Sequence, residues 1–368
     1  MKRVGVVGGG QLARMMIPAA VNLGIDIRVF AESENSSATL AARVVGNYRS
    51  QQEVSAFSSD LDVLTFDHEH VPTDVLIAVR DQGVVVSPSP EALTLTHNKI
   101  VMRHKLADIG VPQPRWSVAG ESRSRDESLS AVGGFPCVAK KPIGGYDGKG
   151  VRVITSWDQI GDWLDDGDVL LEEKVPFVRE LGLLSARSES GEWVPWLPVE
   201  TRQLDGVCAE VIAPAPGLSD QDVAESDFLA RSIADSIGVV GVLAVEVFQN
   251  DDGRLLVNEL AMRPHNSGHI FTELSVTSQF EQHLRAVADL PLGSPAFTAN
   301  AAVMVNLFGE IPEDSKREAW RAVPEAKIHD YGKEPRDGRK VGHISVVGSD
   351  ADKVYARAIE ARSFLSPR

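Results

Sequence analysis

Cysteine is scarce in this sequence: Cys137 and Cys208 are the only two in 368 residues. Two cysteines make neither a disulfide framework nor a zinc site, and they fit a protein of the reducing cytoplasm. No apolar run approaches the roughly 18 residues of a membrane-spanning helix, and the short stretch 4–8 predicts a strand rather than a signal peptide. Positive charge is in deficit too, and the net charge of −15 argues against nucleic acid as a partner, although basic residues gathered locally could bind a phosphorylated small molecule.

The rest of the composition, 43% hydrophobic and 24% charged, is ordinary for a globular protein. A chain of this length allows two or three domains. Strands and helices alternate over the first part of the chain, which predicts a parallel α/β sheet, and two α+β regions follow. The predicted division is residues 1–94, 95–180 and 181–368, with one helix expected over residues 91–110.

A glycine-rich loop at residues 144–150 (GGYDGKG) predicts a site for nucleotide phosphates. Its glycines let backbone N–H groups approach a polyphosphate closely. The apolar run before it, residues 135–142, predicts a buried strand and contains Lys140, and Lys149 lies in the loop itself, so both can supply positive charge. The loop matches neither a P-loop nor a Rossmann loop. Taken alone, it is equally well explained as a tight turn with surface lysines.

The amino-terminal glycines, Gly8–Gly10, lie between a predicted strand and a predicted helix. With Ala13 they match G-x-G-x-x-A, and Glu32 follows about twenty residues on, which is the outline of a dinucleotide-binding fingerprint. A tight turn, or a helix N-terminus that holds another phosphate, explains the same residues. Residues 65–71 (TFDHEHV) place carboxylates at the end of a strand, where open α/β sheets bind ligands.

Two glutamates stand in an apolar hairpin predicted over residues 242–260. A two-residue turn at Asp252-Gly253 places Glu246 opposite Glu259, and a turn at Asp251-Asp252 makes them diagonal neighbours on one face. Opposed like charges are destabilising without a counter-charge, which Mg²⁺ on ATP phosphates would supply. The alternative is that one glutamate is exposed or paired in a salt bridge.

Three further segments carry polar groups. Residues 263–269 (RPHNSGH) follow the hairpin directly and offer donors for a phosphate or carboxylate. Residues 331–343 (YGKEPRDGRKVGH) gather basic side chains in an acidic protein, which predicts either a monophosphate-binding loop or a solvated turn. Residues 171–175 (LEEKV) end a strand and could present backbone groups to an adenine edge, and Glu180 could bind ribose hydroxyls.

Together these segments resemble the ATP-grasp superfamily and, within it, the N5-carboxyaminoimidazole ribonucleotide synthetase family. Single motifs are not specific, but their combination in this order is, and the resemblance covers about residues 1–348. The tail after Gly348 carries no motif and predicts a closing helix. The matching segments are residues 8–12, 65–69, 144–150, 172–175, 258–259, 263–269 and 331–343.

The resemblance implies an ATP-grasp fold with an N-terminal Rossmann-like domain, and ATP between the central and C-terminal domains. Metal ligands for Mg²⁺ or Mn²⁺ would be Glu246 and Glu259. The implied ATP-binding residues are Lys99, Lys140, Gly145, Tyr146, Asp147, Gly148, Lys149, Gly150, Val151, Glu172, Glu173, Lys174, Val175, Glu180, Gln203, Asn258 and Glu259. The implied residues for aminoimidazole ribonucleotide and bicarbonate are Gln11, Leu12, Glu69, Tyr146, Asp147, Asn266, Ser267, Lys333, Arg339 and Lys340, with Arg263, His265 and Lys333 as catalytic residues.

The implied reaction is phosphoryl transfer from ATP to bicarbonate, followed by carboxylation of the ribonucleotide amine. Arg263 would hold bicarbonate and carboxyphosphate, and His265 would assist proton movement. The sequence departs from the family at Lys99, where an arginine is common, and at Gln203, where a histidine is common. Lysine keeps the charge of arginine but loses its bidentate fork.

Two other enzyme classes compete with this interpretation. Another ATP-grasp ligase, such as a formate-dependent glycinamide ribonucleotide transformylase or a biotin carboxylase-type enzyme, would share ATP and Mg²⁺ and differ in substrate. An NAD-dependent oxidoreductase would use the amino-terminal glycines, but it leaves the glutamate hairpin and the central loop unexplained. A non-catalytic nucleotide-binding protein would not need Glu246, Glu259 and Arg263. The family resemblance also implies a cytoplasmic homodimer.

Overall fold

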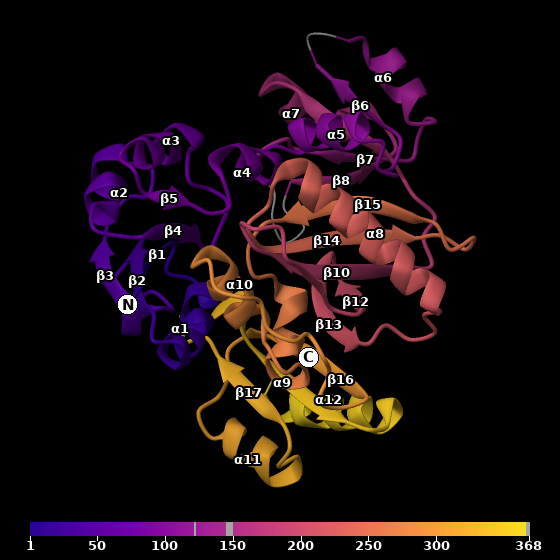
Figure 1. Ribbon diagram of the computed structural model, residues 1–368. Coiled ribbons are helices and arrows are strands. Elements are labelled where there is room, and N and C mark those ends of the chain that lie inside the picture. Colours follow the sequence, from indigo (N-terminus) through magenta and orange to yellow (C-terminus); the bar gives the residue numbers. More distant parts are fainter. Residues whose placement is uncertain (121–122, 145–149, 366–368) are drawn as a thin grey trace.

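The computed structural model describes residues 1–120, 123–144 and 150–365, which form three β-sheets with their own helices (Figure 1). The amino-terminal sheet is wholly parallel, with strand order β3-β2-β1-β4-β5. This confirms the predicted Rossmann-like fold class. Its strands are β1 (Arg3–Val7), β2 (Asp26–Ala31), β3 (Ala42–Val45), β4 (Val63–Phe66) and β5 (Val85–Val86), and its helices are α1 (Gln11–Leu23), η1 (Thr39–Ala41), α2 (Gln51–Ser58), α3 (Thr73–Asp81) and α4 (Pro90–His97).

The helix expected over residues 91–110 is wrong, because the chain forms α4 and then α5 (Lys99–Asp108). Asn98 separates them in an extended conformation, and its side-chain oxygen accepts hydrogen bonds from the N–H groups of Ile100 and Val101. An asparagine that caps a helix in this way starts a new one. The break matters because Lys99 becomes the first residue of α5, and its ammonium contacts Glu259 on a strand of the largest sheet, described below.

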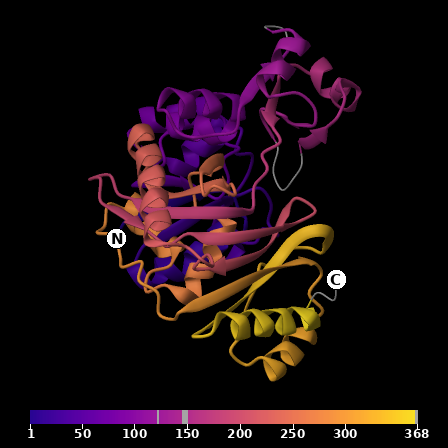
Figure 2. The ribbon, with the colours of Figure 1, turned by 90° about the vertical axis from the view of Figure 1, so that its right-hand side faces the viewer.

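The central sheet is antiparallel, with strand order β6-β9-β7-β8. In Figure 2 it stands apart from the other two sheets and is joined to them near α5 and the start of β10. The segment between β7 and β8 contains the glycine-rich loop. The elements are β6 (Trp116–Ala119), α6 (Arg125–Ala131), β7 (Cys137–Lys140), β8 (Val151–Ile154), η2 (Trp157–Ile160), α7 (Gly161–Asp165) and β9 (Val169–Glu173).

The largest sheet has the order β15-β14-β10-β12-β13-β16-β18-β17, with β11 paired to β10. Helix α8 lies across one end of it, and α12, the predicted closing helix, packs on β16 and β18 at the other (Figure 2). Its strands are β10 (Arg179–Arg187), β11 (Trp193–Pro195), β12 (Val199–Leu204), β13 (Val207–Ala213), β14 (Gly241–Gln249), β15 (Leu255–Ala261), β16 (Ala301–Gly309), β17 (Lys327–Asp330) and β18 (Arg336–Gly348); its helices are α8 (Asp220–Ile237), η3 (Asn266–Ile270), α9 (Phe271–Leu274), α10 (Gln279–Val287), α11 (Ser315–Ala322) and α12 (Ala351–Leu365).

Helix α10 fixes the amino-terminal domain to the large sheet. It packs against both α1 and β14, and Phe280 and Leu284 are buried in one core with Val4 and Met16. The buried His283 bridges the same contact, since its ring meets the Thr65 hydroxyl on β4 and the Val242 N–H on β14. The amino-terminal domain is thereby held beside the strands that carry the two glutamates. No helix in the described part of the chain is both long and apolar enough to cross a membrane.

Candidate active site

Glu246 on β14 lies directly opposite Glu259 on β15, as the sequence predicts. The predicted two-residue turn is wrong. Residues 251–253 make the turn, closed by hydrogen bonds between Asn250 and Arg254 and from Gly253 to Asn250, and Gly253 has φ of +83°. The three-residue turn alone would pair Glu246 with Asn258. A β-bulge between Glu246 and Val247 in the pairing shifts the register by one residue, so that Glu246 pairs with Glu259. The bulge is a feature that re-aims side chains at a site.

The carboxylate pair is electrostatically strained. Withdrawal from water, together with the charges of Glu259 and Glu180, raises the pKa of Glu246 to about 7. Lys99 from α5 supplies one counter-charge, with its Nζ 2.7 Å from Oε1 of Glu259. Two carboxylates on one face fit a divalent cation that takes its other ligands from nucleotide phosphates and water. No group of three or more histidine, cysteine or acidic side chains in the described ranges could hold a metal alone.

Lys140, at the end of β7, brings a cation of the central domain to Asn258, the neighbour of Glu259. Its Nζ donates to Oδ1 of Asn258 at 2.9 Å and lies 2.8 Å from Oε2 of Glu172. Because Asn258 is the residue beside the bulge, its side chain faces the same site as Glu259. Burial opposes the charge of Glu172, but Lys140 and Arg103 outweigh it and lower its pKa. The ion pair therefore holds the lysine at the seam between two domains.

The other residues expected to hold ATP lie along the same seam. Glu180 on β10 accepts a hydrogen bond from Nε2 of Gln203 on β12 at 2.7 Å, and burial raises its pKa. Glu173 pairs instead with the exposed Arg115. Val175 is buried and Lys174 is exposed just after β9. Of the expected loop residues, Gly150 and Val151 are described, whereas Gly145, Tyr146, Asp147, Gly148 and Lys149 lie outside the described residues.

Arg263 and His265 follow β15 and line the other side of the carboxylate pair. Arg263 Nε is 2.8 Å from Oε2 of Glu69, which comes from the amino-terminal domain. The second oxygen of Glu69 is buried and has no hydrogen-bond partner among the described residues. His265 Nδ1 contacts the hydroxyl of Ser267 at 2.8 Å, and its Nε2 is 3.4 Å from Glu246. Burial and the nearby Arg263 lower the pKa of His265 to about 3, so the ring is neutral.

The amino-terminal glycine loop binds the protein's own carboxylates. The N–H groups of Gly10 and Ala13 donate to the two oxygens of Asp67, at 2.9 and 2.8 Å, and the N–H of Gly9 donates to Glu32. A Cβ added to Gly10 would lie 2.1 Å from the Asp67 carboxylate, so the close approach requires glycine. A dinucleotide pyrophosphate needs these same N–H groups. In this conformation the loop N–H groups are occupied by Glu32 and Asp67 and are not available to a pyrophosphate. The oxidoreductase interpretation therefore loses its main support.

Basic residues from the carboxyl-terminal segment meet this loop. Lys333 Nζ donates to Oε1 of Gln11 at 2.5 Å, and the Ser37 hydroxyl donates to the backbone carbonyl of Tyr331 at 2.5 Å. The segment was expected to be a loop, but Arg339 and Lys340 belong to the first part of β18. Both are half-buried. Strand pairing of Lys340 with Phe308 on β16 fixes this part of the chain, which a loop of the same composition would not achieve.

The remaining expected residues lie close to these contacts. Leu12 is buried in α1, next to Gln11. Asn266 begins the short η3 helix and Ser267 is buried within it. Sequence reasoning missed Arg103. It noted Glu32 and the carboxylates of residues 65–71, but it did not expect Glu32 and Asp67 to bind the glycine loop. The available signals were the four-residue spacing of Lys99 and Arg103 on one helix face and the position of Asp67 at the end of a parallel strand.

Three family models match successive parts of the chain. A ribonucleotide synthetase preATP-grasp domain matches residues 1–97, an ATP-grasp domain matches residues 104–280, and a phosphoribosylaminoimidazole carboxylase C-terminal domain matches residues 302–357. N5-carboxyaminoimidazole ribonucleotide synthase of Mycobacterium tuberculosis is 45% identical over 99% of this chain and 87% of its own length. The enzyme of that name from Synechococcus elongatus is 39% identical over 100% and 94%.

Solved structures agree with this relationship. N5-carboxyaminoimidazole ribonucleotide synthetase from Thermus thermophilus superposes with a TM-score of 0.90 at 33% identity, covering 99% of both chains. The Aspergillus clavatus enzyme, solved in complex with ADP and 5-aminoimidazole ribonucleotide, superposes with a TM-score of 0.89 at 29% identity, covering 99% of this chain and 98% of that one. With its opposed glutamates, its parallel amino-terminal sheet and its full-length relatives, the chain belongs to the N5-carboxyaminoimidazole ribonucleotide synthase family of ATP-grasp enzymes.

Proposed function

We propose that this protein is a cytoplasmic, ATP-dependent ligase of purine biosynthesis. It carboxylates the free amine of 5-aminoimidazole ribonucleotide with bicarbonate, giving N5-carboxyaminoimidazole ribonucleotide, ADP and phosphate. The observation that carries the proposal is the opposed pair Glu246 and Glu259, flanked by Lys99 and Lys140 on one side and by Arg263 on the other. The full-length relatives of the same name support the choice of substrate.

The nucleotide end of the site has residues suited to ATP. We assign Lys99 and Lys140 to the phosphates, backbone groups of residues 172–175 to the adenine edge, and Glu180 with Gln203 to the ribose. Glu246 and Glu259 would hold Mg²⁺ or Mn²⁺, which neutralises charge on the transferring phosphoryl group. An oxygen of bicarbonate attacks the γ-phosphorus, the bond to ADP breaks, and carboxyphosphate forms. The expected roles of residues 145–149 stay predictions.

The second half of the reaction falls to the residues around Arg263. Its guanidinium can hold the carboxylate of bicarbonate and of carboxyphosphate through two parallel N–H groups. Glu69 has a buried oxygen without a partner among the described residues, and we assign this oxygen to accept a hydrogen bond from the substrate amine. The amine nitrogen then bonds to the carboxyl carbon, phosphate leaves, and the amine loses a proton. His265 is neutral, which is the form that can accept a proton. Its role in proton movement stays a prediction.

The ribonucleotide phosphate would lie at the junction of the amino-terminal loop and β18. We assign Gln11, Leu12, Asn266 and Ser267 to contacts with the ribonucleotide, and Lys333, Arg339 and Lys340 would provide the positive charge. The contact of Lys333 Nζ with Gln11 supports this assignment. Lysine and arginine bind phosphate strongly at hydrogen-bond distance even in an acidic protein, because the charges closest to the phosphate dominate the electrostatic potential there.

The test is phosphate release from ATP with Mg²⁺ and bicarbonate, with and without 5-aminoimidazole ribonucleotide. We expect release that depends on both substrates, with stoichiometric loss of the free aromatic amine. ATP turnover that ignores the ribonucleotide would move the substrate to that of another ATP-grasp ligase, such as a formate-dependent transformylase. An Arg263→Ala variant that kept full turnover would refute the bicarbonate role of Arg263.

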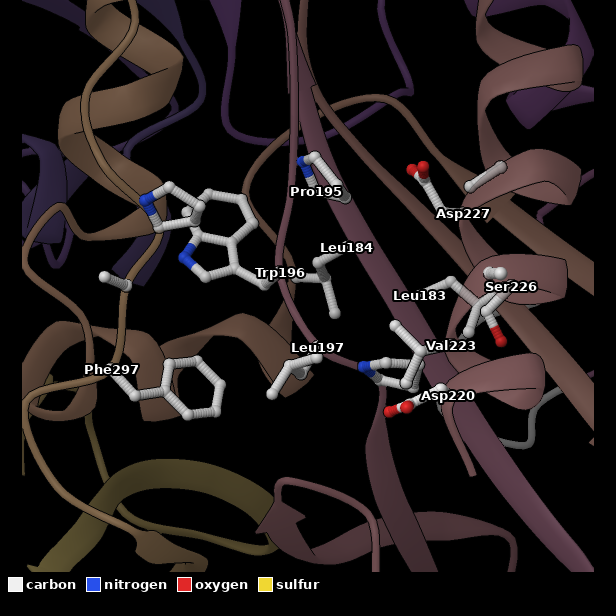
Figure 3. Close-up of a pocket in the computed structure, with 15 residues that line it drawn as sticks. Leu183, Leu184, Pro195, Trp196, Leu197, Asp220, Val223, Ser226, Asp227 and Phe297 are labelled. Carbon is white, nitrogen blue, oxygen red and sulfur yellow. The ribbon is translucent and has the colours of Figure 1, made fainter. Parts of the chain in front are cut away.

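We also propose that the protein is a homodimer. A cavity of about 560 Å³ opens between α8 and the residues after β11, with Trp196 and Phe297 on one side and Val223 on the other (Figure 3). Leu197 at this cavity is 40% exposed, and Phe228 on α8, next to the lining residue Asp227, is 75% exposed. In a two-fold dimer the same patch of each protomer meets the other, so Phe228 of one protomer would enter the hollow of its partner. Light scattering on wild type and on Phe228→Glu tests this, since we expect dimers and monomers respectively.

A further inference from the structure

Arg103 on α5 is fully buried, and each of its guanidinium N–H groups has an acceptor. Nε donates to Oε1 of Glu172 at 2.8 Å, and Nη2 lies 2.7 Å from the same oxygen. Nη1 donates to the carbonyl of Val257 at 2.7 Å and faces Gln113 Oε1 at 3.4 Å, and Nη2 donates to the carbonyl of Asn258 at 2.9 Å. A buried charge this well satisfied is held in one position.

The two carbonyls show what Arg103 does to β15. In a regular strand, successive carbonyls point in opposite directions, so one guanidinium cannot reach both. Val257 and Asn258 are consecutive, and Arg103 reaches both because the β-bulge turns the backbone at this point. β15 is also the edge strand of its sheet, so these groups need partners from outside the sheet. Arg103 is therefore a clamp on the bulge that precedes Glu259.

The carboxylate partner shows what Arg103 does to the central domain. One oxygen of Glu172 binds Arg103, and the other lies 2.8 Å from Nζ of Lys140. Lys140 in turn donates to the side chain of Asn258, whose backbone carbonyl Arg103 holds. The four residues Arg103, Glu172, Lys140 and Asn258 thus form a closed ring of polar contacts across the seam between the central domain and the large sheet.

We propose that Arg103 is a positioning residue that sets the distance between the phosphate-binding lysine, Lys140, and the metal-binding carboxylate, Glu259. It acts through Glu172 on the lysine and through the clamped bulge on the carboxylate, and it touches no substrate itself. The inference rests on the proposed function only in assigning nucleotide and metal to these two groups. Lysine at position 103 would keep the charge but lose the planar fork, whose three separate nitrogens donate to Glu172 and to the two carbonyls.

The experiment compares Arg103→Lys with a matched control, Arg115→Lys. Arg115 pairs with Glu173 on the same strand β9, but its side chain is 63% exposed and, within the described part of the chain, contacts neither Lys140 nor β15. The readouts are the KM values for ATP and for the ribonucleotide, the Mg²⁺ concentration at half-maximal rate, and the Kd of Mg²⁺–ADP by calorimetry. For Arg103→Lys we expect the ATP, Mg²⁺ and ADP constants to rise about tenfold or more, with the ribonucleotide KM unchanged. For Arg115→Lys we expect no change.

Wild-type binding of Mg²⁺–ADP by Arg103→Lys overturns the proposal, and so does an equal rise of both KM values, because a merely structural loss would not separate the two substrates. If wild-type protein shows no ribonucleotide-dependent turnover, the proposed function fails, while the calorimetric comparison still tests Arg103. If Arg103→Lys does not fold, Glu172→Gln replaces it, since this change removes the charge that links Arg103 to Lys140 and should give the same separation. Equal ADP affinity in Glu172→Gln and wild type would then refute the proposal.

Discussion

Lys99 Nζ lies 2.7 Å from Oε1 of Glu259, and this contact ties the first residue of α5 to the edge strand of the large sheet. The two residues are 160 positions apart in the sequence. Glu259 already faces Glu246, so the ammonium of Lys99 balances one of two opposed negative charges. The contact therefore brings a cation of α5 next to a carboxylate of β15, at the seam to which we assign the nucleotide.

Replacing Lys99 tests whether its charge or its shape matters. We expect Lys99→Arg to keep kcat/KM for ATP within about threefold, because a guanidinium supplies the same charge and can bind a carboxylate with two N–H groups. Lys99→Met should lower kcat/KM for ATP by about 10- to 100-fold, because Glu259 and the phosphates lose a cation. Steady-state kinetics with ATP varied decide this. Equal activity of the two variants would show that the Lys99 charge is not used.

Relieving the carboxylate repulsion should stabilise the protein and abolish turnover. Glu246→Gln removes one of two like charges that lie directly opposite each other, which we expect to raise the free energy of unfolding by about 1 kcal/mol in EDTA. The same change removes a proposed metal ligand, so phosphate release should fall below detection. Chemical denaturation in EDTA and the phosphate assay measure the two effects. Glu273→Gln, which breaks a contact with His329 away from the pair, is the control that should not stabilise.

His283 should make the docking of the amino-terminal domain sensitive to acid. Its Nδ1 accepts from the Val242 N–H and its Nε2 contacts the Thr65 hydroxyl, and burial lowers its pKa to about 3. The unfolded chain has a histidine pKa near 6.5, so the unfolded state takes up a proton first as the pH falls. The stabilisation is complete above about pH 6.5 and shrinks by about 2 kcal/mol by pH 5.

The measurement is the free energy of unfolding at pH 8 and pH 5 for wild type and His283→Gln. Because other buried histidines titrate too, the informative quantity is the difference between the two slopes. We expect the loss of stability between the two pH values to be smaller by about 2 kcal/mol in the variant, even if the variant is less stable at pH 8. His104→Gln, at an exposed position, should keep the wild-type slope. Identical slopes for wild type and His283→Gln would contradict the prediction.

The sequence predicts the elements that local patterns determine. α1 is found at the expected residues 11–23, and the opposition of Glu246 and Glu259 is correct although its turn is not. The turn was wrong because a bulge of one residue compensates for a longer loop, and no local pattern marks the bulge. The break at Asn98 was missed because apolar residues continue through it, although asparagine is a favoured helix cap.

Contacts between distant segments could not be predicted in the same way. Arg103 meets Glu172 and Val257 at separations of 69 and 154 residues, and its four-residue spacing from Lys99 does not by itself distinguish it from a surface arginine. The glycine fingerprint is a similar case. Its spacing fits a dinucleotide loop, but the carboxylate that occupies its N–H groups comes from Asp67, after another strand. The family resemblance, which combines many segments, corrected what the single motif suggested.

Asp67 gives a last prediction, because it links the fold of this loop to the substrate. Its two oxygens accept from Gly10 and Ala13, on either side of Gln11, whose side chain contacts Lys333. Asp67→Asn turns one acceptor into an N–H donor that faces another donor, so we expect a loss of about 1–3 kcal/mol in unfolding free energy.

The same change should loosen Gln11, so the KM for the ribonucleotide should rise. The KM for ATP should stay constant, since the residues that we assign to ATP lie at the seam between the central domain and the large sheet. Denaturation and two-substrate kinetics measure both effects. Asp74→Asn, an exposed acid in the first turn of α3, is the control: it also removes a charge near a helix N-terminus but should change neither KM. A rise in the ATP KM of Asp67→Asn equal to that for the ribonucleotide would mean that the loop supports the whole active site and does not belong to the ribonucleotide end.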